Sequence, residues 1–279
     1  MSDSKRRSRG QNKNHNFTPL LVGLAVLTAL LAGWLLFFSG SQEPAVVHNL
    51  QPDWSLLTDA GGGDLFYEDT ARGMISRRGI DVSVHQGQID WQQVKDAGVE
   101  FAIVRLGFRG YGTGTILADE NFQQNVAGAA EAGMPIGVYF YSQAISEAEA
   151  EEEANFVLEQ LSGVTLSYPV VYDLEEYSED AARTDDLTAE QATANALAFC
   201  KRIKSAGYTP MVYMNADWAS RMYDLDALSE NLIWYADYRE EPTLSGGFAM
   251  WQYSCTGCVP GIESADVDLD LFFVPKEQN

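Results

Sequence analysis

The sequence predicts an α/β fold built around a parallel β-barrel. From residue 78 onward, short apolar segments typical of strands alternate with amphipathic segments typical of helices. The strand segments are nearly continuous in apolar residues, as in FAIVRL at 101–106, which indicates burial on both faces. Repeated β-α units of this kind favour a barrel. The helical patterns are lost in the final third, which indicates an incomplete or modified barrel.

The individual elements follow from apolar runs and from signals at their ends. We expect strands at 79–83, 101–106, 136–141, within 168–177, and at 210–214, 232–236, 248–253 and 267–272. We expect helices at 89–97, 119–132, 146–161, from 188 to about 207, and around 218–223. Glycines at 98, 133 and 207 mark three helix ends. Ser146 with Glu149 and Thr188 with Gln191 have the spacing of capping boxes.

The N-terminal part differs from the rest in charge and hydropathy. Residues 1–18 are polar and basic, and we expect a cytoplasmic tail. The segment 19–38 includes nineteen uncharged residues from 20 to 38, about enough to cross a bilayer as a helix. Because basic residues precede it, we expect the C-terminal body outside the cytoplasm. The alternative is a cleaved signal peptide and a secreted body. The length of the apolar run and the lack of an A-x-A site favour a retained single-pass membrane anchor.

The segment 39–77 separates this anchor from the barrel pattern. It contains three glycines at 61–63 and the aromatic residues Trp54, Phe66 and Tyr67, without a sustained period. We expect an extracytoplasmic stem, partly docked through its aromatics, followed by a barrel domain at 78–275.

The net charge is −22, from 18 basic and 40 acidic residues. The first 40 residues hold five basic residues and one acidic residue, or +4, so the remainder carries 13 − 39 = −26. An acidic body of this kind repels nucleic acid, so we expect no nucleic-acid partner. We expect the protein to be a monomer.

The cysteines and histidines do not form a metal-binding pattern. His15, His48 and His85 are scattered, and we expect no metal and no cofactor. Cys255 and Cys258 form a C-x-x-C, and in an oxidising compartment we expect a disulfide between them.

Three carboxylates follow the apolar residues of the segment YPVVYDLEEY at 168–177. In an extended strand alternate side chains share a face, so Asp173 and Glu175 lie on one face and Glu176 on the other. Because neighbouring carboxylates do not both ionise easily, one of the pair should keep a raised pKa and act as a proton donor. Cleavage of a glycosidic bond requires such a pair.

Motifs in the same order along the chain resemble the family 25 glycoside hydrolases, the bacterial and phage lysozymes. The segment GIDVSVHQG at 79–87, with Ile89-Asp90-Trp91, is similar to the family's opening strand. Further matches are FAIVRLGFRG (101–110), GVYFYS (137–142), the D-L-E at 173–175, YMN (213–215), LIWYA (232–236), MWQY (250–253) and VDL (267–269). The chain departs from the family pattern at Glu176, Asp237 and the two cysteines. We expect the first two to be solvated acids.

The resemblance implies a modified TIM-like (β/α)5(β)3 barrel and hydrolysis of the β-1,4 bond between N-acetylmuramic acid and N-acetylglucosamine, with peptidoglycan glycan strands as the partner. It implies that Glu175 is the general acid. It implies that Asp173 stabilises positive charge at the reacting carbon or orients the substrate's acetamido group. Asp81 and Asp268 match the other two acids of the family's groove. Direct nucleophilic attack, water activation and acetamido participation all stay open as routes.

Aromatic residues near strand ends are candidates for stacking on sugar rings. They are Tyr139, Tyr141, Tyr213 and Trp251, and for each of them packing inside the core is an equal alternative. We expect Arg105 to be a buried partner of a carboxylate. A chitinase-like glycosidase and a non-catalytic wall-binding membrane tether are the alternative functions. The chitinase-like alternative predicts a longer D-x-x-D-x-D-x-E run, which Tyr168, Val170 and Val171 interrupt.

Overall fold

The computed structural model describes residues 52–61, 63–177, 180–244 and 247–276. The basic tail, the expected membrane segment at 19–38 and the first part of the expected stem lie outside these residues. Within the described ranges, no helix is both long and apolar enough to cross a bilayer.

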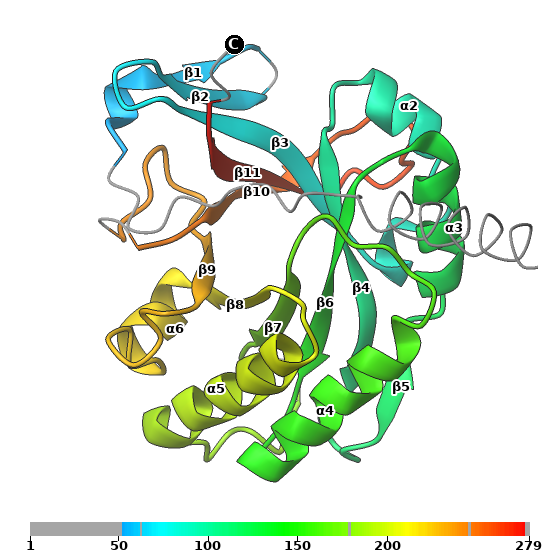
Figure 1. Cartoon of the computed structure of the whole chain (residues 1–279), viewed down its shortest axis with the longest axis vertical. Coiled ribbons are helices and arrows are strands. Elements are labelled where there is room, and N and C mark those ends of the chain that lie inside the picture. The colour runs from blue at the N-terminus through cyan, green and yellow to red at the C-terminus, as the bar shows by residue number, and fades with distance from the viewer. Residues whose placement is uncertain (1–51, 62, 178–179, 245–246, 277–279) are drawn as a thin grey trace, which may run out of the picture. The chain divides into compact units, whose positions relative to one another are not determined.

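Eight strands close into a barrel (Figure 1). In order around the barrel they are β3 (Met74–Val82), β4 (Phe101–Arg109), β6 (Ile136–Ser142), β7 (Val170–Leu174), β8 (Pro210–Asn215), β9 (Leu232–Ala236), β10 (Met250–Gly257) and β11 (Val267–Pro275). Neighbouring strands from β3 to β10 are parallel. The last strand, β11, runs antiparallel to both β10 and β3 and so closes the barrel.

Helices follow the first five barrel strands and are lacking after the last three in the described part of the chain. They are α2 (Trp91–Asp96), α3 (Phe122–Ala132), α4 (Glu147–Gln160), α5 (Ala189–Ser205) and α6 (Ala216–Arg221). A 3-10 turn, η2 (Val84–Gln86), precedes α2, and a short strand, β5 (Ile116–Ala118), pairs with β4 before α3. Five β-α units followed by three strands are the arrangement that the family resemblance implies.

Predicted capping residues start two of these helices. Ser146 Oγ accepts a hydrogen bond from the backbone N–H of Glu149, and Thr188 Oγ1 accepts one from Gln191. Each oxygen satisfies a backbone donor that has no partner inside its own helix. Ser146 and Thr188 are therefore confirmed as N-caps, but at Ser146 the predicted capping box is not complete, because Glu149 Oε2 accepts from the backbone N–H of Ile145 rather than of Ser146.

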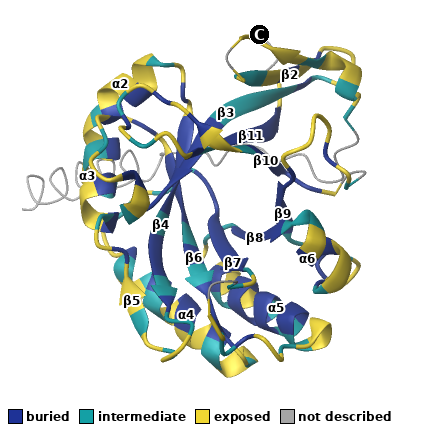
Figure 2. Cartoon of the chain, turned by 180° about the vertical axis from the view of Figure 1, so that it is seen from behind, coloured by how far each residue is buried: buried dark blue, intermediate teal, exposed yellow. Residues whose placement is uncertain are grey.

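Alternation along the strands sorts the apolar residues into two layers. On β8, Met211 packs into the barrel interior, whereas Val212 and Met214 belong to the layer between the sheet and the helices. Phe101, stacked on Tyr168 at 4.3 Å between ring centroids, is part of the interior layer. Figure 2 shows β4 and β8 to β11 as largely buried, the first half of β3 as intermediate, β2 and β5 as partly exposed, and the outer faces of the helices as exposed. Most of the barrel strands are therefore buried on both faces, as their continuous apolar runs predict.

The end of the expected stem is part of the folded domain. Strands β1 (Leu57–Asp59) and β2 (Leu65–Asp69) form a hairpin, and β2 pairs with the start of β3. Trp54, in the 3-10 turn η1 (Trp54–Leu56), packs against Phe248 and Trp251, with ring centroids 6.2 and 5.4 Å away. The boundary expected between residues 77 and 78 is therefore too late, because β3 already begins at Met74.

The predicted disulfide between Cys255 and Cys258 is not formed in this structure, where both thiols are exposed and free. Cys255 lies within strand β10 and Cys258 directly follows its last residue, so the segment between them is extended and is not the small loop that the prediction assumed.

Candidate active site

Five acidic residues from three strands meet at one end of the barrel. Asp81 is near the carboxyl end of β3, and Asp173 and Glu175 lie at the carboxyl end of β7. Asp268 and Asp270 lie at the amino end of β11. Because β11 is antiparallel to the other strands, its amino end shares the rim with their carboxyl ends, and Asp268 pairs directly with Asp81. The acids of the first, fourth and last barrel strands therefore converge, as expected.

Alternation along β7 places Asp173 and Glu175 on the inner face. Val171, two residues earlier, packs in the barrel interior, while Tyr172 and Leu174 pack on the outer side. Burial raises the pKa of Asp173, and the negative charge of Glu175 raises it further. The two acids therefore act on each other within one site.

The most buried acids have strongly raised pKa values. Asp81, Asp173 and Asp270 are only 6%, 5% and 0% exposed, and burial is the main reason that the pKa of each lies well above its usual value. Neighbouring carboxylates add to this effect, since Asp268 and Asp270 both raise the pKa of Asp81. So many carboxyl groups in one buried cluster do not ionise together, and the cluster retains protons at neutral pH.

Glu175 and Asp268 are closer to solvent and have smaller shifts. Burial raises the pKa of Glu175 to about 7, a hydrogen bond from Tyr213 opposes the rise, and the charge of Asp268 adds to it. Burial, with the charge of Asp266, raises the pKa of Asp268 to about 6. A glutamic acid that is half protonated near neutral pH is suited to proton donation.

A glutamine that the sequence analysis did not single out holds Asp81. Gln252 Nε2 donates to Asp81 Oδ2 at 2.7 Å, and Gln252 Oε1 accepts from the Tyr238 hydroxyl at 2.8 Å and from the Tyr213 hydroxyl at 3.3 Å. Alternation along β10 was the available signal, because Gln252 follows the interior residue Met250 by two positions. The amide is oriented by its oxygen partners, so its NH2 group faces the acid.

The four predicted aromatic residues have different surroundings. Tyr139 and Tyr141 are half-buried at the mouth, and Tyr213 is 6% exposed. Trp251 lies on the outer side of β10, is fully buried, and donates its indole N–H to the carbonyl oxygen of Asp237 at 2.8 Å. Trp251 is therefore not part of the mouth, because its side chain faces away from it.

Arg105 pairs with a buried carboxylate, as expected. Its Nε lies 2.7 Å from Asp119 Oδ2, and the same oxygen accepts a hydrogen bond from the backbone N–H of Val84. The positive charge of Arg105 also lowers the pKa of Asp173, against the larger effects of burial and of Glu175. Arg105 therefore favours the ionised form of Asp173.

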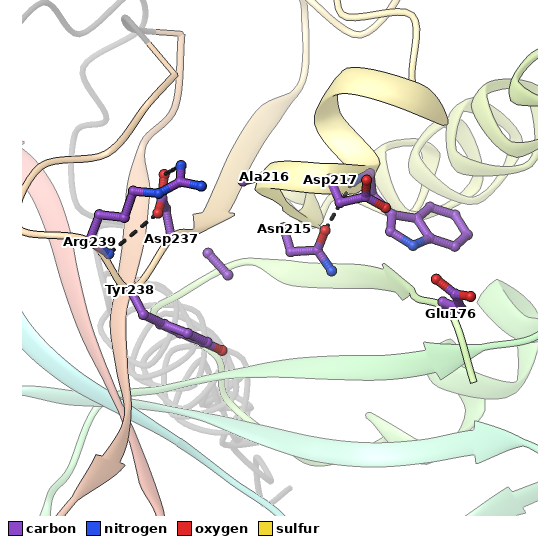
Figure 3. A pocket seen from close by; sticks show the side chains of 9 residues that line it. Glu176, Asn215, Ala216, Asp217, Asp237, Tyr238 and Arg239 are labelled. Carbon is purple, nitrogen blue, oxygen red and sulfur yellow. Dashed lines mark hydrogen bonds and ion pairs between the residues drawn. The ribbon is translucent and has the colours of Figure 1, made fainter. Parts of the chain in front are cut away.

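A cavity of about 510 Å³ lies at the carboxyl ends of β8 and β9, and none of the five acids is among its lining residues (Figure 3). Its lining residues are Glu176, Asn215, Ala216, Asp217, Trp218, Ala236, Asp237, Tyr238 and Arg239. The Tyr238 side chain is 53% exposed and extends away from the ion pair between Asp237 and Arg239 (Figure 3). A flat aromatic face at the edge of a polar cavity suits a sugar ring.

Glu176 and Asp237 differ in their surroundings, although both were expected to be solvated. Glu176 is exposed. Asp237 is buried, and its Oδ2 accepts from the backbone N–H and the hydroxyl of Thr243 at 2.9 and 2.7 Å. These bonds lower the pKa of Asp237 despite its burial. Asp237 therefore holds the loop after β9, and the expectation for it was wrong.

No group of three or more His, Cys, Asp or Glu side chains among the described residues is arranged to hold a metal ion. The chemistry available at the mouth is that of carboxyl groups, tyrosine hydroxyls and amides.

A (β/α)5(β)3 barrel with a pair of carboxyl groups at its mouth has the architecture of a glycoside hydrolase. The family model described as "Glycosyl hydrolases family 25" matches residues 80–262, and the chain belongs to this family.

Relatives within the family include named lysozymes. The chain is 29% identical over 205 residues to Lysozyme M1 of Streptomyces globisporus, covering 70% of this chain and 67% of the relative. It is 27% identical over 197 residues to the autolytic lysozyme of Clostridium acetobutylicum, covering 70% of this chain and 55% of the relative, so it spans about half of that protein. The crystal structure of a bacterial lysozyme from Streptomyces coelicolor is 27% identical, with a TM-score of 0.57 over 70% of this chain and 91% of that chain.

Proposed function

We propose that the protein is a peptidoglycan hydrolase that cleaves the β-1,4 bond between N-acetylmuramic acid and N-acetylglucosamine, with Glu175 as the general acid. The observation that carries this proposal is the state of Glu175. It lies at the barrel mouth, half-buried, beside a buried partner acid on the same face of β7, and its pKa is raised to about 7. At neutral pH a large fraction of Glu175 is therefore protonated, in a position from which it donates to a glycosidic oxygen.

The other acids complete the proposed mechanism. When Glu175 protonates the leaving oxygen, positive charge develops at the anomeric carbon. The Asp173 carboxyl group stabilises this charge or orients the acetamido group of the substrate. Asp268, whose pKa burial raises only to about 6, supplies further negative potential at the same rim, while Asp81, held by Gln252 and paired with Asp268 between β3 and β11, keeps its proton. Water then completes the hydrolysis, and Tyr139, Tyr141 and Tyr238 provide faces for the sugar rings.

The names of the relatives support peptidoglycan as the substrate, since two of them are called lysozymes. The two alternatives are less favoured. A wall-binding tether has no need of a proton donor with a pKa near 7. A chitinase-like enzyme is not the family to which the chain belongs.

Two glutamate substitutions test the proposal. Purified protein is incubated with peptidoglycan, and new reducing ends are measured. We expect Glu175→Gln to abolish their release while the protein still pellets with the wall, and Glu159→Gln to release them like the wild type, because Glu159 is exposed in the last turn of α4. Unchanged release by Glu175→Gln would remove Glu175 as the acid.

We also propose that the segment 19–38 anchors the protein in the bacterial cell membrane, with the barrel outside as a monomer. The apolar run and the basic residues before it support this topology. Membrane fractionation of cells that express the full chain tests it. An intact band in the membrane fraction is expected, whereas a shortened, secreted form would show that the segment is a cleaved signal peptide.

A further inference from the structure

Tyr213 is too buried to serve mainly as a surface for sugars. It lies on β8 beside Asp173 of β7, and only 6% of it is exposed. Its ring meets Trp234 edge-on, with 4.9 Å between centroids and 76° between the ring planes. The ring is therefore committed to the barrel interior, and the hydroxyl group is the part of Tyr213 that acts on the site.

The Tyr213 hydroxyl has two acceptors within reach. It donates to Gln252 Oε1 at 3.3 Å in the structure. The second acceptor is the carboxyl group of Glu175, which lies two residues beyond Asp173 on the same face of the neighbouring strand, and the Tyr213 hydroxyl lowers the pKa of Glu175 against the larger effect of burial. A phenol carries a single donor hydrogen, so Tyr213 serves only one of the two acceptors fully at any time.

Gln252 does not depend on Tyr213 for its hydrogen bonds. The Tyr238 hydroxyl donates to the same Oε1 at the shorter distance of 2.8 Å, and Gln252 Nε2 remains bonded to Asp81 Oδ2. When Tyr213 turns away, the amide oxygen keeps a good partner and the grip on Asp81 is retained. The hydroxyl is therefore free to change acceptors without leaving a buried polar group unpaired.

We propose that Tyr213 is a positioning residue whose hydroxyl turns from Gln252 to Glu175 as Glu175 gives its proton to the leaving oxygen. This role rests on the proposed function. The proton of Glu175 moves to the glycosidic oxygen as the C–O bond breaks, and the Tyr213 proton stays on Tyr213. Only the acceptor of its hydrogen bond changes. A hydrogen bond that strengthens as the carboxylate forms stabilises the transition state more than the ground state.

Acidic groups surround Glu175 and Tyr213, and the hydroxyl group of Tyr213 opposes their effect on the ionisation of Glu175. The charged and titratable neighbours of the two residues are Tyr141 of β6, Asp173 of β7, Tyr223 after α6, Tyr238 after β9, Asp81 of β3 and Asp268 of β11. The carboxylates among them oppose ionisation of Glu175. A hydrogen bond from Tyr213 favours the ionised form, so it offsets part of this repulsion when the proton leaves.

Tyr213→Phe tests the proposal, because it keeps the ring against Trp234 and removes only the hydroxyl group. We expect kcat on peptidoglycan to fall about tenfold or more, in line with loss of a hydrogen bond to a charged group, with little change in KM. Without the donor, the pKa of Glu175 rises, so the alkaline limb of the kcat–pH profile moves to higher pH. A purely structural role of Tyr213 would not move this limb.

Three further variants keep the test decisive. Tyr238→Phe leaves Gln252 dependent on Tyr213 and holds that hydroxyl away from Glu175, so the limb should also move to higher pH, with a smaller loss of kcat. In the double variant the limb should move no further than in Tyr213→Phe alone, although kcat should fall further because Gln252 loses both hydroxyl donors that orient it. Tyr208→Phe, before the amino end of β8 and thus at the opposite end of the barrel, is the matched control and should behave like the wild type.

The outcomes separate this inference from the proposed function. If the wild type releases no reducing ends, the proposed function fails. If the wild type is active but Tyr213→Phe leaves the alkaline limb in place, or changes KM alone while thermal unfolding is unaltered, then the inference is overturned and the activity stands.

Discussion

Asp81 and Asp268 occupy paired positions on the antiparallel strands β3 and β11, although 187 residues (268 − 81) separate them in the chain. Two acids opposite each other in a sheet repel, and such a pair is destabilising unless one of them keeps a proton. Here burial raises the pKa of both, and Gln252 holds Asp81 in place. Buried carboxyl pairs with raised pKa values of this kind are concentrated at functional sites.

The pH dependence of activity should follow Glu175. Glu175 can donate a proton only in its acid form, and its pKa is about 7. We therefore expect kcat to fall as pH rises through about 7. Initial rates of reducing-end release between pH 4 and 10 provide the measurement. An alkaline limb near the ordinary pKa of a glutamic acid, about 4.3, would contradict the assignment.

Asp270→Asn should stabilise the protein at neutral pH. Asp270 is fully buried with a strongly raised pKa, and its Oδ1 accepts the Trp234 indole N–H at 2.8 Å, a bond that an asparagine oxygen can keep. Because the folded state binds this proton more tightly than the unfolded state, wild-type stability falls as pH rises above the unfolded value of about 3.9.

We therefore expect the free energy of unfolding of Asp270→Asn to exceed that of the wild type at pH 7.5. The difference should shrink toward zero near pH 3, where the acid is protonated in both states. Urea denaturation at the two pH values tests this, and a variant that is less stable at pH 7.5 would contradict it.

Arg109→Met should destabilise the fold. Arg109 Nε contacts Glu153 Oε1 at 2.7 Å, and neither side chain is more than 4% exposed. Burial already raises the pKa of Glu153 to about 7, opposed by bonds from Ser142 and Arg109. Loss of the partner should cost about 3–5 kcal/mol at pH 8. The cost should be smaller at pH 5, where Glu153 is protonated. Equal losses at both pH values would argue against a buried charge as the cause.

Gly79→Ala should also destabilise the barrel. A Cβ atom at position 79 would lie 2.1 Å from the Phe101 ring, which is fully buried and stacked on Tyr168. Overpacking of this kind costs about 1–3 kcal/mol. The matched control is Gly112→Ala, because nothing lies within 4 Å of a Cβ there. Thermal unfolding should separate the two variants, and equal melting temperatures would contradict the packing argument.

Local sequence patterns predicted most of the strands and helices of the barrel. Apolar runs located its strands, and the side-chain oxygens of Ser146 and Thr188 located two helix starts to within a residue. The D-x-E spacing placed Asp173 and Glu175 on one face, because the period of a strand is two residues. The order of parallel units then brought Asp81 to the same rim.

The remaining features depend on contacts between distant segments. Strands β1, β2 and β5 are short and have no sequence pattern of their own. Pairing defines them, since β1 pairs with β2, β2 with β3, and β5 with β4. Trp251 was a candidate for the mouth because a strand buried on both faces does not reveal which face is inside. Gln252 bonds to both Tyr238 and Asp81, and its separation of 171 positions (252 − 81) from Asp81 conceals this relationship in the sequence.

Mass spectrometry of peptidoglycan digested by the purified protein tests the central claim most directly. It identifies both the bond that is cut and the sugar left at the new reducing end. We predict fragments that end in reducing N-acetylmuramic acid with the wild type and none with Glu175→Gln. Fragments that end in reducing N-acetylglucosamine, or the same products from both proteins, would contradict a muramidase in which Glu175 donates the proton.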